Sequence, residues 1–329
     1  MSQIPVRFPM FLITLIHQSH VLLVASTDLQ MSFPPPTANG SAAADLAVFM
    51  HPSTPWDTEW YASNSPIPPY LNGSPEIRFA GSFGSSGPST KIARGVVLFS
   101  DLSICWYSVT YGRGTPATRW ARFRPCPSPI SSAAALRHAA ETHGAAVAAF
   151  AEQAAASGRP VARGECWDIA HEALLHASSL FGPRDAPVLS TSRAHGHLLF
   201  CGKPGGVGRW RGADDRFRAG DVVEWRSVRI GGAQPGSFSI LGDPDHTAVL
   251  VADTVPRCAV ADGMSVRPAD VGVLTVVEQT AGRAPKRESY DLAKLLQGEV
   301  WVYRPIGMVE YLGSTLNVDI PPGLETFAV

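Results

Sequence analysis

Charge of either sign is scarce in this sequence. Only 17% of the 329 residues are charged, and 27 lysines and arginines against 28 aspartates and glutamates leave a net charge of −1. A chain that coats nucleic acid or an anionic membrane needs a basic surface, so this balance argues against both classes. No glycine-rich segment follows an expected strand with the spacing of a phosphate-binding loop, so nucleotide binding has no support either.

Cysteines are few and irregularly spaced. They never form a CxxC pair and stand at Cys105, Cys126, Cys166, Cys201 and Cys258. An odd, dispersed set fits neither a disulfide framework nor a tetrahedral zinc site, and it indicates a reducing compartment. The residues closest to a zinc-binding pattern are His195 and His197, with Cys201 or Cys166. They lack the second pair of ligands that a structural site needs, so we expect no metal and no cofactor.

The sequence also lacks an uninterrupted apolar stretch of membrane-spanning length. Its most apolar segment, residues 8–26, approaches that length, but the polar run 17–20 interrupts it in the middle. A spanning helix needs about 20 predominantly apolar residues, and polar side chains at the bilayer centre are costly. As a signal peptide the segment has one preceding cation, Arg7, and no clear cleavage site. We therefore expect a cytoplasmic chain without a stable membrane span, rather than a secreted one.

The composition that is present predicts a folded, loop-rich protein. Hydrophobic residues make up 45% of the chain, enough for a core, while 30 glycines and 28 prolines predict many turns. Shifts in composition predict a disordered N-terminal segment and linker at 1–45, a β-rich unit at 46–130, an alanine-rich helix at 131–158, an α+β domain at 159–306 and a C-terminal tail at 307–329.

The domain at 159–306 contains the side chains that a thiol hydrolase needs. Cys166 heads a segment with helical periodicity, where the positive end of the helix dipole favours a thiolate. His246 follows the turn GDPD and opens the strand HTAVLV, and Glu278 ends a further apolar strand. If those strands pair, Glu278 can orient the imidazole of His246. This order predicts a nucleophile, a general base and acid, and an orienting carboxylate.

Neighbouring polar residues leave part of this assignment open. Gln279 or Asp245 could orient the imidazole in place of Glu278. Glu165 and Asp168 flank the thiol and would oppose thiolate formation by like-charge repulsion if they lie close to it.

Four motifs resemble a known domain: RGECWDIAHEAL, DHTAVL, VVEQT and GEVWVYRP. They are similar to a fungal cysteine proteinase-fold domain. That domain forms the C-terminal part of the myosin tail region-interacting and altered inheritance of mitochondria proteins, which are linked to cortical actin patches. The same order of residues is more distantly similar to bacterial CHAP and NlpC/P60 amidases. The resemblance extends from about Trp56 to Pro305.

The resemblance implies a papain-like α+β fold, in which a cysteine-bearing helix packs on an antiparallel sheet after a small β-rich unit and the alanine-rich helix. It implies Cys166 as nucleophile, His246 as general base and acid, and Glu278 as orienting group of an amide, isopeptide or thioester hydrolase. It also implies a protein or peptide partner, with components of the cortical actin patch as the expected ones.

Two departures from active relatives define the alternative. Papain-like proteases carry a glutamine a few residues before the cysteine, whereas residues 160–165 read PVARGE. CHAP-type sites read Glu-Gln-Asn where this chain has Glu278, Gln279 and Thr280. The alternative hypothesis is therefore an inactive papain-fold module that binds a protein partner at the actin patch. An open groove above Cys166 would favour the enzyme, and a filled groove the binding module.

Overall fold

A computed structural model describes residues 38–62, 67–71, 77–232 and 234–329. The apolar segment 8–26 and most of the expected linker lie outside these residues, so the expectations for both stay predictions. In the described part of the chain, no helix combines the length and the hydropathy needed to cross a bilayer.

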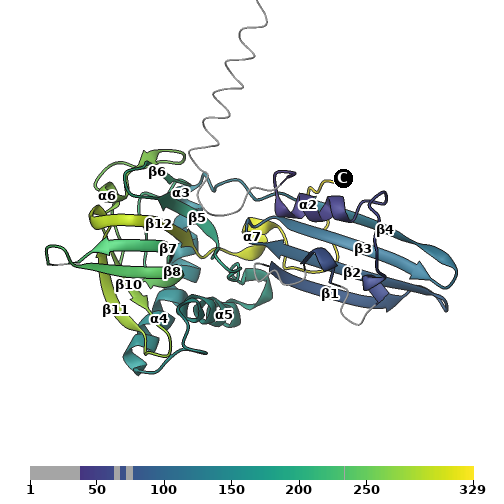
Figure 1. Cartoon of the computed structure of the whole chain (residues 1–329), viewed down its shortest axis with the longest axis horizontal. Helices are drawn as coiled ribbons and strands as arrows, with labels where there is room; N and C mark the ends of the chain where they lie inside the picture. The colour runs from purple at the N-terminus through teal and green to yellow at the C-terminus, as the bar shows by residue number, and fades with distance from the viewer. Residues whose placement is uncertain (1–37, 63–66, 72–76, 233) are drawn as a thin grey trace, which may run out of the picture. The chain divides into compact units, whose positions relative to one another are not determined.

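The β-rich unit is a four-stranded antiparallel sheet in the order β1-β2-β3-β4 (Figure 1). Its strands are β1 (Ile77–Ser85), β2 (Thr90–Phe99), β3 (Ile104–Gly112) and β4 (Thr115–Arg124). Side chains alternate between the two faces, so Cys105, Tyr107 and Val109 share one of them. That face is covered by helix α2 (Ala42–Phe49) and the short 3₁₀ helices η1 (Trp60–Ala62) and η2 (Pro69–Leu71).

Helix α2 begins inside the expected linker. The hydroxyl of Ser41 accepts a hydrogen bond from the Ala44 N–H at 3.2 Å and so caps the first turn. Ala43 and Leu46 are fully buried in the core beside the sheet. The predicted end of the linker at residue 45 is therefore wrong, because a helix that begins with small residues looks like flexible chain when only its composition is considered.

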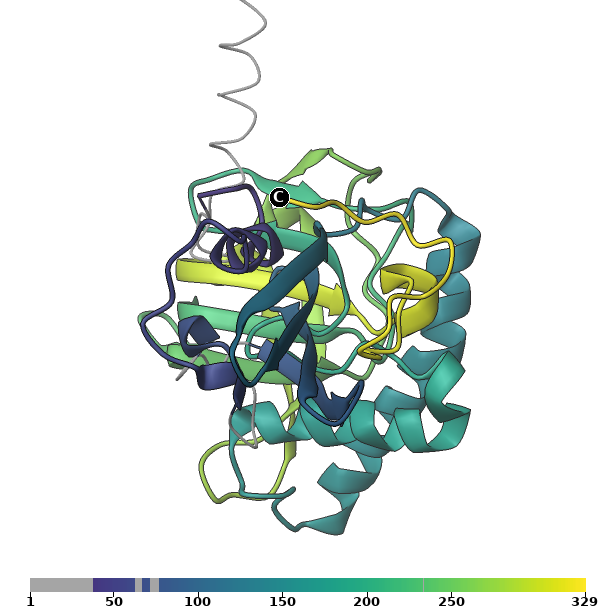
Figure 2. The ribbon, with the colours of Figure 1, turned by 90° about the vertical axis from the view of Figure 1, so that its right-hand side faces the viewer.

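The opposite face of this sheet is covered by the end of the chain. Trp106 is buried there and donates its indole N–H to the carbonyl of Asn317 at 3.0 Å. Phe123 of β4 and Phe327 form an isolated antiparallel bridge, and Figure 2 shows the C-terminal segment beside these strands. Residues 307–329, expected as a tail, thus complete the core of a sheet that lies far away in sequence.

The second sheet has eight strands, paired antiparallel in the order β11-β10-β8-β7-β12-β5-β6-β9. They are β5 (His197–Gly202), β6 (Gly208–Trp210), β7 (Val222–Gly231), β8 (Phe238–Leu250), β9 (Ser265–Val266), β10 (Val273–Glu278), β11 (Lys286–Asp291) and β12 (Leu295–Arg304). Short helical turns join or follow these strands: α6 (Pro268–Val271), η4 (Leu292–Lys294) and α7 (Met308–Leu312).

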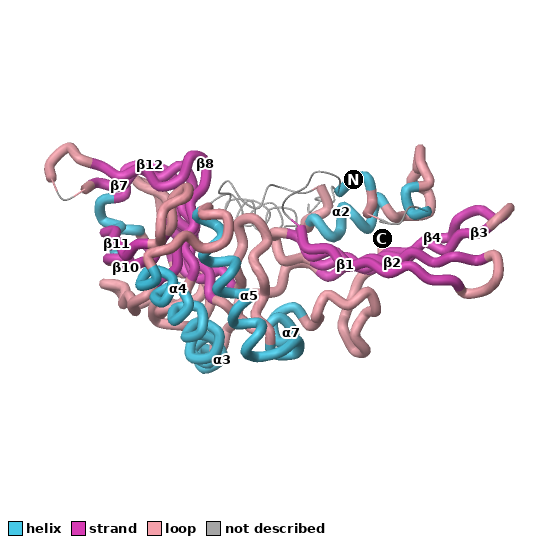
Figure 3. Tube along the Cα trace, turned by 90° about the horizontal axis from the view of Figure 1, so that it is seen from below, coloured by secondary structure: helices cyan, strands magenta, loops and turns pink. Residues whose placement is uncertain are grey.

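The cysteine-bearing helix α5 (Cys166–Asp185) packs on this sheet. Its buried residues Ile169, Ala173 and Leu174 belong to one hydrophobic core cluster, which also contains Val222 of β7 and Val249 of β8. Figure 3 shows α5 and the preceding helix α4 (Ala145–Ser157) on one side of these strands. The predicted α+β class, with a cysteine-bearing helix on an antiparallel sheet, is confirmed.

The alanine-rich segment forms one helical run with an irregular middle. It consists of α3 (Ala133–Ala139), the π-helical turn η3 (Ala140–Gly144) and α4, and ends at Gly158 with a φ of 63°. The backbones of Gly144 and Gly220 approach so closely that a Cβ on Gly220 would stand 2.0 Å from the Gly144 oxygen. The single regular helix expected at 131–158 is therefore interrupted where it meets the loop before β7.

A buried ion network joins the end of β12 to the start of β7. The Arg304 side chain has 0% exposure and donates from Nε and Nη2 to Asp221, each at 2.8 Å. Its Nη1 donates to Asp214 and, at 3.2 Å, to the carbonyl of Leu136 in α3. Opposite charges and hydrogen bonds together compensate for the loss of water around these groups.

Candidate active site

Cys166 is the first residue of α5, and the preceding residue caps the helix. The Asp168 carboxylate accepts from the Glu165 N–H at 3.1 Å, and the Asp168 N–H donates to the Glu165 backbone carbonyl at 3.1 Å. The Cys166 N–H belongs to the first turn, where backbone amides have no acceptor within the helix and where the positive end of the helix dipole lies. This helix start therefore favours negative charge beside Cys166.

The carboxylate of Asp168 is compensated by Arg163. Arg163 Nη2 lies 2.8 Å from Asp168 Oδ1, and the Arg163 backbone N–H donates to Oδ2 at 2.9 Å. Burial raises the pKa of Asp168, but the guanidinium and the backbone N–H groups outweigh burial and hold that pKa below its ordinary value. The sequence predicted that the Asp168 carboxylate would repel a thiolate at Cys166. Arg163 reduces that repulsion because it compensates the charge of Asp168.

His246 lies within a strand and not at its start. Strand β8 runs continuously through residues 242–245, the GDPD sequence that was expected to form a turn. The pairing of β7 with β8 changes register between Arg226 and Val228, opposite this stretch. The expected strand start at His246 is therefore wrong. Residues 242–244 of β8 stand against the single residue Ser227 of β7, and a strand can contain glycine and proline where it is itself bulged.

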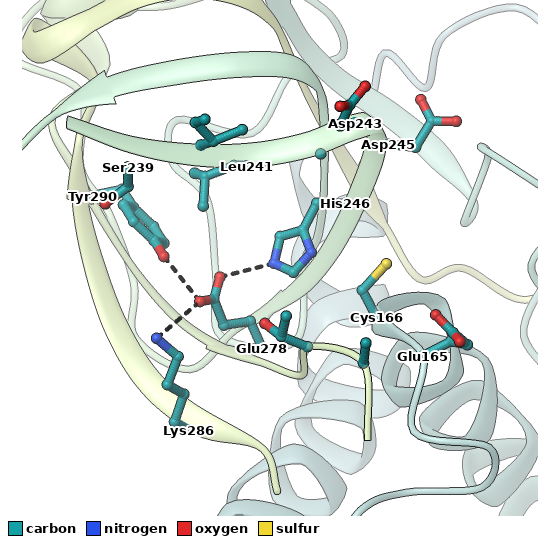
Figure 4. Close-up of a pocket in the computed structure, with 14 residues that line it drawn as sticks. Glu165, Cys166, Ser239, Leu241, Asp243, Asp245, His246, Glu278, Lys286 and Tyr290 are labelled. Atoms are coloured by element: carbon teal, nitrogen blue, oxygen red, sulfur yellow. Dashed lines mark hydrogen bonds and ion pairs between the residues drawn. The ribbon is translucent and has the colours of Figure 1, made fainter. Parts of the chain in front are cut away.

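Glu278 reaches His246 because β10 pairs with β8. It stands opposite Ala248, which is two residues from His246 and on the same face of β8. Glu278 Oε2 lies 3.0 Å from His246 Nε2, and Tyr290 donates to Oε1 at 2.9 Å (Figure 4). Burial raises the pKa of Glu278, but His246, Tyr290 and the ammonium of Lys286, 3.6 Å away, bring it below its ordinary value.

The imidazole of His246 lies between Glu278 and Cys166. Figure 4 shows the side chain of Cys166 beside the ring, on the side away from Glu278. Burial lowers the pKa of His246, but its hydrogen bonds with Cys166 and Glu278 raise that pKa to about 9. The ring is then protonated at neutral pH and places a positive charge beside Cys166. The structure thus brings Cys166, His246 and Glu278 together.

The raised pKa of His246 should make the stability of the protein depend on pH. Because the pKa rises from 6.5 to about 9 on folding, the stabilisation is complete below 6.5 and is lost as the pH rises through about 9. We expect the free energy of unfolding, measured by urea titration, to fall by on the order of 2 kcal/mol across this range. His246→Gln should remove this slope, and a slope that persists in the variant would contradict the prediction.

Gln279 and Asp245, the other candidates for orienting the imidazole, bind other groups. Gln279 accepts from the Val161 N–H at 2.7 Å and donates to the carbonyls of Val161 and Glu165 at 3.1 and 2.9 Å. Asp245 pairs with Arg193 at 2.7 Å. The amide of Gln279 thus fastens the loop before the cysteine to the end of β10.

Tyr290 and Lys286 were missed by the sequence reasoning. Both belong to β11, whose polar sequence KRESYD gives no local sign of a site. Only the pairing of β11 with β10 brings them near the carboxylate, since Lys286 stands directly opposite Glu278 in the register.

The histidines considered as zinc ligands have other partners. His195 Nε2 lies 2.7 Å from Glu224 Oε1, and His195 Nδ1 lies 2.7 Å from the Ser190 hydroxyl. His197 Nδ1 lies 3.1 Å from the Tyr311 hydroxyl. Within the described ranges, no group of three or more histidine, cysteine, aspartate or glutamate side chains is arranged to hold a metal ion.

A cavity of about 560 Å³ lies over the site. Cys166, His246 and Glu278 line it together with Ile240 and Leu241 of β8. Its size falls in the ordinary range of ligand pockets, about 300–1,000 Å³. In the described part of the chain, the groove above Cys166 is therefore open.

A cysteine at the head of a helix, with an imidazole and a carboxylate on neighbouring antiparallel strands, is the arrangement of a cysteine proteinase fold. A family model described as the AIM3/BBC1 cysteine proteinase-fold domain matches residues 120–316. The chain belongs to this family, as the resemblance of its motifs predicted. The matched region begins in β4 and extends through α7, so it includes the alanine-rich helical run.

A curated relative extends the similarity to more of the chain. The sequence is 27% identical over 285 residues to Altered inheritance of mitochondria protein 3 of Debaryomyces hansenii. The aligned region covers 83% of this chain and 28% of the relative, so the chain spans well under half of that protein. No solved structure matches the chain.

Proposed function

We propose that this protein is a cysteine hydrolase that cleaves an amide, isopeptide or thioester bond. The observation that carries the proposal is the placement of His246, whose Nε2 lies 3.0 Å from Glu278 Oε2 and whose ring lies beside Cys166 (Figure 4). An open cavity gives a substrate access to the same residues.

In the proposed mechanism, the thiolate of Cys166 attacks the carbonyl carbon of the substrate. The His246 imidazolium gives its proton to the leaving group, and the acyl group stays on the sulfur as a thioester. The ring, now neutral, takes a proton from a water molecule that attacks the thioester, and the acid product leaves. Glu278 holds the ring and stabilises its positive charge, and the Cys166 N–H at the helix start is available to the oxyanion.

Labelling by iodoacetamide tests the proposal without a known substrate. At about pH 6 an ordinary thiol is almost entirely protonated, so we expect Cys166 to react at least about tenfold faster than a reference thiol. Cys258 is a free, exposed cysteine of the same chain and serves as that reference. Mass spectrometry of the two peptides from one sample gives both rates. Equal rates would overturn the proposal.

A second candidate function is a papain-fold module that binds a protein partner without catalysis. It is favoured by the loop before Cys166, which supplies no glutamine, and by the nearby Gln279, whose amide is already bound to Val161 and Glu165. The resemblance to actin-patch proteins supports a cytoplasmic place at the cortical actin patch for either function. Slow labelling of Cys166 would favour the module.

A further inference from the structure

A second cavity, of about 300 Å³, shares Cys166 and Asp245 with the cavity already described. Its other lining residues include Glu224 of β7 and Thr247 of β8, which stand opposite each other in the register of the two strands. Because successive side chains of a strand alternate, Thr247 faces away from the side that carries His246. Cys166 therefore borders two cavities, and the second has no part in the proposed mechanism.

Glu224 is a buried carboxylate, and only one of its two oxygens has hydrogen-bond partners among the described residues. Its side chain is 1% exposed, and its Oε1 accepts from the Thr247 hydroxyl at 2.7 Å and lies 2.7 Å from His195 Nε2. Its Oε2 is buried and has no hydrogen-bond partner among the described residues. A buried carboxylate oxygen without a partner is costly, so a ligand that supplied a donor would recover that energy.

Two carboxylates and one guanidinium line this cavity. Arg193 donates from Nε and Nη2 to Asp245 Oδ2, at 3.0 and 2.7 Å, and so compensates one of the two carboxylates. Asp245 Oδ1 remains buried without a partner in the described structure, as does Glu224 Oε2. Two buried carboxylate oxygens without a hydrogen-bond partner suit a group that has several N–H donors and a positive charge.

We infer that this cavity binds an alkylammonium or guanidinium group of the substrate. This inference rests on the proposed function, and it makes the substrate class a basic one, with its cationic group held at Glu224 while its acyl carbon reaches Cys166. Glu224 would then be a specificity-determining residue, and Thr247 and His195 would hold its carboxylate in place.

Two thiol reagents of similar size test the inference. One reagent, 2-ammonioethyl methanethiosulfonate, is cationic, and the other, ethyl methanethiosulfonate, is neutral. With either reagent, the Cys166 thiolate forms a mixed disulfide and expels methanesulfinate. The measured quantity is the ratio of the cationic to the neutral rate at Cys166, divided by the same ratio for 2-mercaptoethanol. We expect Glu224→Gln to lower this normalised ratio by about tenfold, because a carboxylate in a cleft concentrates cations.

A matched variant controls for the general field of the protein. Glu172 lies on the same helix as Cys166 but lines neither cavity, so Glu172→Gln should leave the ratio unchanged. Asp245→Asn should also lower the normalised ratio. Because the Asp245 side chain is more exposed than that of Glu224, this variant can still be measured if Glu224→Gln does not fold.

The failure of the inference and the failure of the proposed function are distinguishable. Fast neutral labelling of Cys166, with the same normalised ratio in wild type, Glu224→Gln and Asp245→Asn, would overturn the inference and leave the hydrolase intact. Neutral labelling of Cys166 no faster than that of Cys258 would overturn the hydrolase, and the cationic subsite with it.

Discussion

Replacement of His246 by alanine should lower the rate at which iodoacetamide labels Cys166 at about pH 6 by about 100-fold. The imidazole supplies a positive charge beside the thiol, because its pKa is raised to about 9 and it is protonated at this pH. Without the ring, Cys166 keeps only the helix dipole, which contributes far less than a full charge. Mass spectrometry of the Cys166 peptide at timed intervals gives the rate.

Two variants bracket this effect. Glu278→Gln keeps the ring in place but removes the carboxylate that supports its charge, so we expect a smaller loss, of about tenfold. His138 is an exposed histidine of α3, and His138→Ala should leave the rate unchanged. If His246→Ala labelled as fast as His138→Ala, no activated pair would exist at this site.

Replacement of Arg304 by alanine should destabilise the protein by about 3–5 kcal/mol. The change leaves Asp221 and Asp214, which are 0% and 1% exposed, as buried carboxylates without this partner. Their desolvation is then uncompensated, and the carbonyl of Leu136 also loses a donor. Urea titration followed by tryptophan fluorescence gives the free energy of unfolding.

The control for this prediction is an exposed ion pair of the same type. Arg267 pairs with Asp270 at 2.7 Å, and its side chain is 72% exposed. Arg267→Ala should therefore cost no more than about 1 kcal/mol. A loss for Arg304→Ala as small as that for Arg267→Ala would show that water reaches the buried network.

Local patterns were enough to predict the fold class and the main elements of the catalytic domain. The apolar runs 221–225, 271–277 and 300–303 predicted strands, and β7, β10 and β12 lie over them. Helical periodicity placed the start of a helix at Cys166, where α5 begins. These features depend on neighbours in sequence, which is why patterning could find them.

Contacts between distant segments could not be predicted in this way. The segment 307–329 follows the last strand and contains glycines and prolines, and only its contacts with the distant residues Trp106 and Phe123 show that it covers a sheet. The binding of Gln279 to the loop before Cys166 likewise depends on how β10 meets α5. The boundaries predicted at 131 and 159, and the chemical roles of the site residues, stay predictions.

Glu278 is the last residue of β10 and Gln279 follows it, so their side chains point to opposite sides of the chain. One of them supports the base of the site and the other supports the nucleophile. Glu278 holds the imidazole of His246, and Gln279 holds the backbone that leads into Cys166. Because side chains alternate, an insertion or deletion of one residue within β10 would exchange the two sides and misplace nucleophile and base together. Changes in loop length around β10 should therefore be tolerated during divergence, whereas a single-codon change in the length of the strand itself should not.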